Sequence, residues 1–181
     1  RDKQLEDYLK NKEKLTNISS EKNEQIIKDL SHQIINFGKK PNLVDEDQNI
    51  LIKNLTTQLE IITINSILDN KSKNIIEDET INGIKLRLQK IDGLPSKELR
   101  KLVDKGKKDL DEGIIVVFAN KDEKVGLAVG ITENLTSKFD AVKFVKVGSE
   151  IIGGKGGGGR KDFAQAGGQD KNKIDQAIIE I

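Results

Sequence analysis

The sequence lacks the residues on which several classes of site depend. It contains no cysteine and a single histidine, His32, among its 181 residues. Disulfides, cysteine nucleophiles and zinc sites built from Cys and His are therefore excluded, and we expect neither a catalytic triad nor any other metal site. Because His32 lies between polar residues in a helical pattern, we interpret it as a surface or interface residue.

Aromatic residues and long apolar runs are also scarce. Aromatic residues make up 3% of the sequence and hydrophobic residues 35%, whereas 34% are charged. This composition is thin for one compact core and favours an elongated part with solvated helices. With no long apolar run and no signal-peptide pattern, we expect a soluble, cytoplasmic protein without a membrane partner. Since the chain starts at Arg1 and has no methionine, we expect it to be a piece of a longer protein.

The charge is distributed unevenly along the chain. Residues 1–82 carry 12 Lys and Arg against 15 Asp and Glu, whereas residues 83–181 carry 19 against 15. The net charges of the two parts are therefore −3 and +4. The second part is the better candidate for contact with an anionic partner.

Two helices are predicted in the first part. Residues 3–37 contain no Gly or Pro and place apolar residues at spacings of three and four, which predicts a long helix with one narrow apolar stripe. Gly38 is expected to end it. Asp45, with Gln48 three residues later, is expected to cap a second helix that runs to about Ser72.

The second helix has more Ile and Leu than the narrow stripe of the first can cover. A 3-4-3 spacing, typical of a coiled-coil seam, defines the candidate dimer-interface residues Ile52, Leu55, Leu59 and Ile62. Two helices joined by a short loop predict an antiparallel, coiled-coil-like hairpin. Because an exposed apolar face usually marks a protein interface, we expect residues 1–82 to form a helical arm that self-associates or docks onto another domain of the parent chain.

After residue 82 the hydrophobic pattern changes from helical to alternating. The expected elements are a strand from 84 to 90, a helix capped by Ser96 and closed by Gly113, antiparallel strands at 113–119 and 124–131, and a helix from 141 to 151. They lead into a glycine-rich loop. This order predicts a small globular α+β domain over residues 83–181, with helices packed on a mixed sheet.

Residues 153–168 contain eight of the 16 glycines, together with three cations and one Asp. An ordinary helix or central strand is not expected here, and glycine lets backbone N–H groups approach a bulky anion closely. We interpret the stretch as a binding loop. The alternative is a flexible linker, against which the ordered residues 160–166 argue. A Gly-x-Gly-x-x-Gly pattern occurs, but it follows a predicted helix instead of a strand, so the dinucleotide fingerprint fails.

The same stretch resembles a known family. It reads GGKGGGGRKDFAQAGG and is similar to the C-terminal signature of alanyl-tRNA synthetases, a domain also called DHH-associated. Relative to the family pattern there is one extra glycine, and Lys161 stands where proline is usual, which adds a cation. The resemblance extends upstream through residues 82–84, 99–104 and 113–116.

The resemblance implies a C-terminal fragment of an ATP-dependent alanine–tRNA ligase, without the catalytic domain or the zinc-dependent editing site of that family. The fragment is then not an enzyme and needs no cofactor. In the family this part joins chains through the helical arm and holds the elbow of tRNA(Ala), so that aminoacylation and editing act on one bound tRNA. The implied partners are tRNA(Ala), a second copy as a homodimer, and the remaining domains of the parent synthetase.

The resemblance also implies which residues bind tRNA: Lys155, Gly156, Gly157, Gly158, Arg160, Lys161 and Gln165. We expect the cations to engage phosphates or sugars, the loop N–H groups to assist, and Gln165 to hydrogen-bond a ribose or a base edge. Phe163, the one nearby aromatic residue, is interpreted as core packing.

Two other interpretations stay open. In DHH phosphoesterases a related glycine motif holds a nucleotide substrate, so the chain can be the nucleotide- or nucleic-acid-binding domain of such an enzyme. Alternatively it is a purely structural oligomerisation module whose glycine loop only packs against a neighbouring domain.

Overall fold

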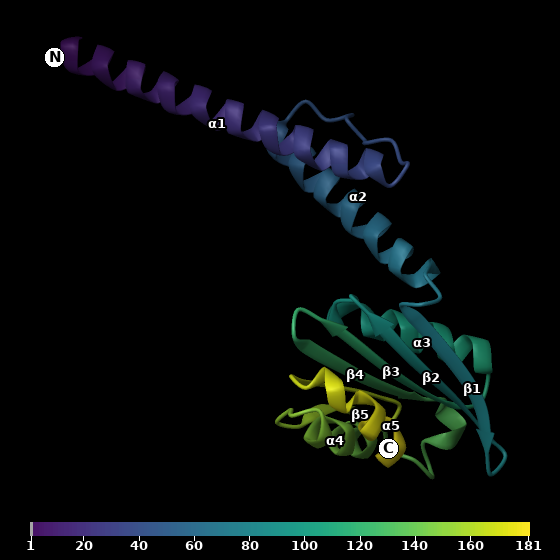
Figure 1. The fold of residues 1–181 in the computed structure, drawn as a ribbon. Helices are drawn as coiled ribbons and strands as arrows, with labels where there is room; N and C mark the ends of the chain where they lie inside the picture. Colours follow the sequence, from purple (N-terminus) through teal and green to yellow (C-terminus); the bar gives the residue numbers. More distant parts are fainter. Residues whose placement is uncertain (1) are drawn as a thin grey trace. The chain divides into compact units, whose positions relative to one another are not determined.

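The computed structural model describes residues 2–181. The chain divides into two compact units, the first extending to Ser66 and the second covering Ile67–Ile181. The first unit contains α1 (Asp2–Asn36) and most of α2 (Gln48–Asp69), and the second contains a mixed sheet with helices (Figure 1). The predicted α+β class, with two packed N-terminal helices followed by a helix-covered sheet, is confirmed.

Both helices of the first unit begin and end close to the predicted positions. The chain leaves α1 at Gly38, which has a φ of 72° and donates its N–H to the carbonyl of Ile35 at 2.8 Å. The cap of α2 is Asp47, because its Oδ1 accepts hydrogen bonds from the N–H groups of Asn49 (2.8 Å) and Ile50 (3.2 Å). The prediction of Asp45 as the cap was therefore wrong, because the capping residue lies two positions later in the chain.

The two helices pack together but run in the same direction, so the predicted antiparallel arrangement was wrong. At the start of α2, Asn49 Oδ1 accepts from Asn23 Nδ2, halfway along α1, at 3.4 Å. Further along α2, Gln58 Nε2 donates to the carbonyl of Lys40, beyond the end of α1, at 2.8 Å. The physical reason is the connection, residues 37–47, which is long enough to return along α1 before α2 begins (Figure 1).

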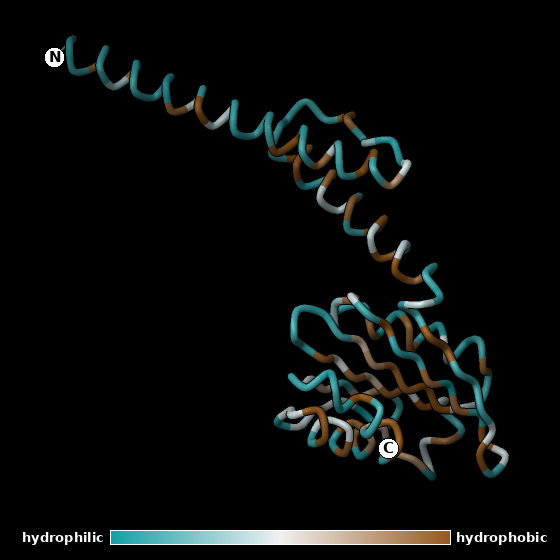
Figure 2. The backbone as a smooth tube through the Cα atoms, in the orientation of Figure 1, coloured by the Kyte–Doolittle hydropathy of each residue, from teal (hydrophilic) through white to brown (hydrophobic). Residues whose placement is uncertain are grey.

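The apolar residues of this unit are used unequally. Ile34 of α1 and Leu55 of α2 are both fully buried, while Ile52, Leu59 and Ile62 are half-buried. The first half of α1 carries large apolar residues that are 53–68% exposed: Leu5, Tyr8, Leu9, Leu15 and Ile18. Figure 2 shows short hydrophobic segments interspersed along the otherwise hydrophilic start of α1.

Within the described residues the sheet of the second unit has six strands in the order β1-β2-β3-β4-β6-β5. They are β1 (Asn74–Ile81), β2 (Ile84–Asp92), β3 (Ile114–Lys121), β4 (Lys124–Ile131), β5 (Gly157–Arg160) and β6 (Phe163–Gly168). The pair β2–β3 is parallel and the other pairs are antiparallel. Strand β1 was not predicted. It pairs with β2 along its whole length, so the second unit includes residues before the sequence-based boundary at 82 and 83.

Helices cover the two faces of the sheet. Helix α3 (Leu99–Leu110) packs on β3 and β4 from one side, and α4 (Ala141–Ile151) packs on β4, β5 and β6 from the other, next to α5 (Ile174–Glu180). The main core lies on the α4 side, where alternate residues such as Phe118, Leu127 and Val129 are at most 1% exposed. On the inner side of α3, Leu99, Val103 and Leu110 are buried and Leu102 is half-buried.

Two details of the second unit matter for the site. Ser96 does not cap α3 with its side chain, since a short 3-10 turn, Ser96–Glu98, precedes the helix. Its carbonyl instead accepts a hydrogen bond from Gln165 Nε2 on β6 at 3.1 Å. None of the helices described for residues 2–181 has the length and apolar character needed to cross a membrane.

Candidate nucleic-acid interface

The glycine-rich stretch forms a β-hairpin and not the predicted loop. Strand β5 lies at the edge of the sheet, Lys161 and Asp162 form the turn, and β6 lies between β5 and β4. The expectation that no interior strand would form here was wrong. Ala164 and Ala166 of β6 are buried members of the core, because small side chains let the hairpin pack closely against α4 and β4.

Most glycines of the hairpin are required by close packing. A Cβ atom at Gly154 would lie 2.0 Å from the carbonyl oxygen of Gly167, and Cβ atoms at Gly157 and Gly159 would lie 2.5 and 2.3 Å from atoms of β6. Gly158 differs, because a Cβ atom there would meet nothing within 4 Å and its φ is not positive. The fold of the described residues therefore does not explain glycine at this position.

A buried serine holds the start of the hairpin. Ser149 of α4 is 0% exposed, and its Oγ donates to the carbonyl of Gly167 at 3.2 Å and accepts from the N–H of Gly156 at 3.2 Å. Ser149 was not predicted as a site residue. Its position four residues after the buried Val145, on the apolar face of the predicted helix, was the available signal.

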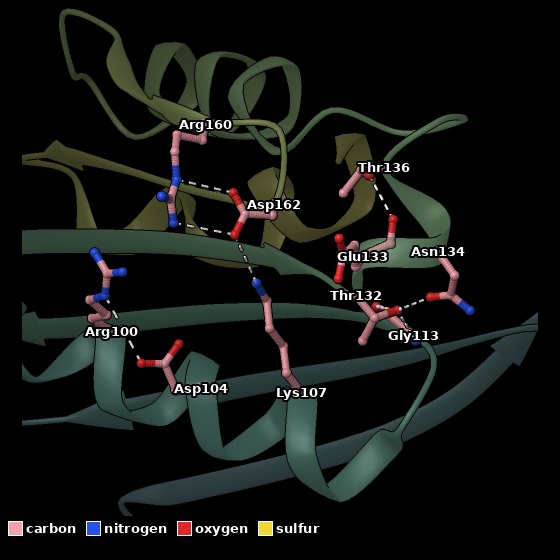
Figure 3. Close-up of polar contacts among 10 residues, drawn as sticks. All are labelled: Arg100, Asp104, Lys107, Gly113, Thr132, Glu133, Asn134, Thr136, Arg160 and Asp162. Carbon is pink, nitrogen blue, oxygen red and sulfur yellow. Dashed lines mark hydrogen bonds and ion pairs between the residues drawn. The ribbon is translucent and has the colours of Figure 1, made fainter.

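The cations of the hairpin turn lie beside a cation from α3. Asp162 Oδ1 is 3.2 Å from Arg160 Nε, and Asp162 Oδ2 is 3.6 Å from Lys107 Nζ. Figure 3 shows Arg160 and Asp162 on the hairpin facing Lys107 on α3. Lys161 is exposed at the same turn. Because Asp162 pairs with two of these cations, it neutralises part of the positive charge at this end of the hairpin.

The remaining predicted site residues lie further along the hairpin. Lys155 is exposed and precedes β5, whereas Lys161 follows it. With a rise of about 3.3 Å per strand residue, β5 separates these cations by at least roughly 10 Å. The structure therefore brings Arg160 and Lys161 together and places Lys155 and Gly156 at the opposite end of the same sheet edge.

Two side chains of β6 face α3 and not the main core. Gln165 is half-buried and bonded to Ser96 as described above. Phe163 is half-buried, and the guanidinium carbon of Arg100 lies 4.9 Å from its ring centroid, within the range of a cation–π contact. Phe163, interpreted from the sequence as core packing, lies on the α3 side of β6 and outside the main core cluster on the α4 side.

The turn also borders an open depression on the surface. Its lining includes three cations, Lys107, Arg160 and Lys161, and three carboxylates, Asp111, Glu133 and Asp162. Residues 2–181 contain no group of three or more His, Cys, Asp or Glu side chains with the arrangement of a metal site. The depression thus offers mixed charges and exposed hydrogen-bonding groups at the end of an edge hairpin.

A separate ion cluster fixes the other edge of the sheet. Arg87 of β2 bonds Asp78 of β1 through Nε at 2.8 Å and Asp109 of α3 through Nη1 at 2.8 Å. The hydrogen bond from Arg87 lowers the pKa of Asp78, while partial burial opposes the shift. Since the Arg87 side chain is only 15% exposed, it ties β1, β2 and α3 together as a structural element.

A mixed α+β sheet with a glycine-rich edge hairpin defines the class of domain, and comparison with known proteins identifies the family. Residues 83–181 match the family model described as the DHHA1 domain, which is more than half of the chain. The chain therefore belongs to the DHHA1 domain family.

Curated relatives with strong sequence similarity are alanine–tRNA ligases. The enzyme of Parvibaculum lavamentivorans is 46% identical over 101 residues, which is 55% of this chain and 11% of the relative. The enzyme of Rhodopseudomonas palustris is 48% identical over 102 residues, or 56% and 12% of the two chains. The chain thus spans about a tenth of the length of the curated relatives it matches.

A solved structure supports the same fold. The C-Ala domain from Aquifex aeolicus alanyl-tRNA synthetase superposes with a TM-score of 0.54 at 24% identity, covering 57% of this chain and 92% of that one. At this identity the likeness establishes the fold. Together with the family match and the relatives, it confirms the resemblance to the C-terminal region of alanyl-tRNA synthetases.

Proposed function

We propose that this chain is a non-catalytic module from the C-terminal part of an alanine–tRNA ligase, which binds tRNA(Ala) through the glycine-rich hairpin and self-associates through the helical unit. The observation that carries the proposal is the identity of 46% to an alanine–tRNA ligase over 101 residues. Aminoacylation and editing would belong to the remaining domains of the parent protein.

The hairpin turn supplies charge for an RNA backbone. Arg160 and Lys161 are exposed, and Lys107 lies beside them. Arginine and lysine are the side chains that most often contact phosphates. The turn therefore provides up to three cations within reach of neighbouring phosphates. In the free protein two of these cations, Lys107 and Arg160, are paired with Asp162.

The edge of β5 supplies backbone donors. The carbonyl of Asp162 accepts from the N–H of Ile131 on β4, so the alternation of an antiparallel ladder directs residues 163 and 165 toward β5. On β5, Arg160 pairs with residue 163 and Gly158 pairs with residue 165. The alternate residues Gly157 and Gly159 therefore direct their N–H and C=O groups away from the sheet. Without side chains, this edge lets sugar or phosphate oxygens approach the backbone.

The helical unit supplies a surface for self-association. Leu55 is fully buried within a single chain, so the predicted seam is partly used by the packing of α1 and α2. The exposed apolar residues in the first half of α1 extend the interface that we propose for a homodimer, since patches of this kind mark protein contacts.

The RNA-binding test is a titration of labelled tRNA(Ala) at several salt concentrations. We expect the logarithm of affinity to fall linearly with the logarithm of salt concentration, and the double variant Arg160→Glu, Lys161→Glu to abolish binding. The matched control is Lys143→Glu with Lys146→Glu, which makes the same charge change at two exposed lysines of α4, on the side of the sheet away from α3 and Lys107. Equal affinity of wild type and the hairpin variant at low salt would overturn the assignment.

The non-catalytic part of the proposal has its own measurements. The pure chain is expected to give no alanine-dependent pyrophosphate exchange, and detection of that exchange would refute the proposal. Manganese-dependent phosphodiesterase activity would favour the DHH phosphoesterase interpretation instead. A dimer by sedimentation that binds no tRNA would favour the purely structural module.

A further inference from the structure

An exposed arginine and an aromatic ring form a cation–π contact, called the Arg100–Phe163 stack below, beside the hairpin on the face of the sheet that α3 covers. Arg100 projects from the first turn of α3, and its side chain is 59% exposed. Its guanidinium lies over the ring of Phe163 on β6. Arg100 Nε also lies 4.0 Å from Asp104 Oδ2. Arginine side chains stack on aromatic faces, and the exposure of Arg100 leaves part of its guanidinium open to solvent.

The surface next to this stack has little side-chain bulk. Gly158 of β5 pairs with Gln165 and Gly167 follows two residues after Gln165, and all three positions share the α3 side. Gly158 and Gly167 are exposed, and a Cβ at either would meet no atom closer than 3.5 Å. A planar group stacked on Arg100 therefore has room to extend over the hairpin.

A hydrogen-bond acceptor, the side-chain oxygen of Gln165, lies next to the stack. Gln165 uses Nε2 to bond the carbonyl of Ser96, and within the described part of the chain its Oε1 has no hydrogen-bond partner. That acceptor lies two residues from Phe163 on the same face of β6. An amide oxygen at the edge of a stacking surface is suited to accept from the exocyclic amino group of a base.

We propose that the Arg100–Phe163 stack receives an exposed base face of the bound RNA, a nucleobase or the open side of a terminal base pair, with Gln165 at its edge. This inference rests on the proposed function and adds a base-stacking subsite to the phosphate contacts of Arg160 and Lys161. Protein recognition of structured RNA uses unstacked bases that lie on aromatic rings or guanidinium planes. A phosphate would be held by charge alone and would not require an aromatic ring beneath the guanidinium.

Two substitutions of Arg100 separate planarity from charge. Arg100→Lys keeps the charge and removes the plane, whereas Arg100→Trp keeps a plane and removes the charge. Both residues are accepted on an exposed helix. We expect Arg100→Lys to weaken tRNA binding roughly tenfold with the salt dependence unchanged, and Arg100→Trp to bind more tightly than Arg100→Lys.

The introduced tryptophan is also a specific reporter, because the chain contains no other tryptophan. We expect tRNA to quench its emission by base stacking, and inorganic polyphosphate to bind without quenching it. The control is Phe139→Trp, since Phe139 packs against the core on the opposite side of the sheet; its emission is expected to stay unchanged with tRNA.

The outcomes distinguish the two proposals. If wild type binds tRNA but Arg100→Lys binds equally well and Arg100→Trp is not quenched, the stacking subsite is overturned while the RNA-binding function stands. A reduction of the salt slope by about one in Arg100→Trp, without quenching, would identify Arg100 as a phosphate contact and also overturn it. If wild type binds no tRNA at any salt concentration, the proposed function fails first and the stacking subsite fails with it.

Discussion

Ser149 and Gly167 connect α4 to the glycine-rich hairpin, with the hydroxyl of Ser149 3.2 Å from the carbonyl oxygen of Gly167. Because the same hydroxyl accepts from the N–H of Gly156, one buried side chain joins both strands of the hairpin to the helix that precedes it. The position of the candidate RNA-binding edge therefore depends on a residue that is itself inaccessible to RNA.

Replacing Ser149 by Ala should loosen the hairpin without unfolding the domain. The substitution removes two hydrogen bonds, which contribute about 1 kcal/mol each, and leaves the N–H of Gly156 and the carbonyl of Gly167 without this partner. We expect the free energy of unfolding to fall by about 1–2 kcal/mol and the amide of Gly156 to exchange hydrogen faster. Thr136→Ala, which removes an exposed hydroxyl bonded to a nearby carbonyl at 2.6 Å, serves as control; an equal loss of stability there would contradict a special role for Ser149.

Two neighbouring glycines should respond in opposite ways to alanine. At Gly154 the added Cβ would collide with the backbone of Gly167 and with Ser149 Oγ, so we expect a loss of several kcal/mol, as for other overpacked sites. At Gly158 the space is open, and Gly158→Ala should change stability by no more than about 0.5–1 kcal/mol, in the stabilising direction. Urea denaturation of both variants measures this; similar destabilisation by both would show that the open face of Gly158 is misplaced.

The sequence predicted the elements whose hydrophobic pattern is continuous. The run ending at Ala119, the alternation from Ile84, and the amphipathic helix from Ala141 each correspond to an observed element, because burial on one or two faces imposes a period that single residues do not obscure. The apolar stripe of α1 was readable for the same reason.

Features set by pairing with distant residues could not be predicted in this way. Strand β1 contains three consecutive acidic residues, Glu77 to Glu79, and forms a strand because β2 supplies its backbone partners and Arg87 pairs with Asp78. The glycines of β5 have low strand propensity, and their pairing depends on the position of β6. Similarly, the direction of α2 is set by the path of its connection, about which helical periodicity carries no information.

The candidate site was predicted in part. The sequence indicated Arg160, Lys161 and Gln165 through an ordered stretch next to the glycines, but Lys107 and Arg100 come from a helix more than fifty residues earlier. These two residues lie beside the hairpin because α3 packs on β3 and β4. The sequence pattern does not show this packing.

Asp162 should restrain RNA binding, because its carboxylate pairs with both Arg160 and Lys107 in the free protein. In Asp162→Asn both cations become available to phosphates while the turn keeps its backbone hydrogen bond to Ile131. We expect affinity for tRNA to rise several-fold at low salt and the salt dependence to become steeper. The control Asp111→Asn makes the same charge change in the same depression, and an equal gain there would mean that only net charge matters.

The Arg87–Asp78 pair predicts a pH dependence of stability. The pKa of Asp78 is lowered in the folded state, so the stabilisation is fully present above the unfolded pKa of about 3.9 and is lost as pH falls through the lower folded value. Because the Asp78 side chain is 49% exposed, solvent screening limits the contribution to about 1 kcal/mol or less. Asp78→Asn should therefore be less stable than wild type at pH 7 and equally stable at low pH.

Urea denaturation of wild type and Asp78→Asn from pH 7 down to about pH 1–2, where Asp78 is protonated in the folded state as well, tests this dependence. Glu79→Gln, the neighbouring carboxylate on β1, is the control, because Glu79 forms no ion pair within the described residues. A constant difference between wild type and Asp78→Asn across the whole range would show that protonation of Asp78 does not contribute.

The exposed apolar residues of α1 predict where self-association is sensitive to charge. Leu9 and Leu15 are 53% and 68% exposed, so Leu9→Lys with Leu15→Lys should leave the fold of the single chain intact while placing two cations in the proposed interface. We expect sedimentation to show a shift from dimer to monomer at micromolar concentration, with the circular dichroism unchanged. Lys10→Ala with Lys14→Ala on the same helix is the control. A dimeric mass retained by the leucine variant would exclude this part of α1 from the interface. Ile52, Leu59 and Ile62 on α2 would then be the remaining candidates for the interface.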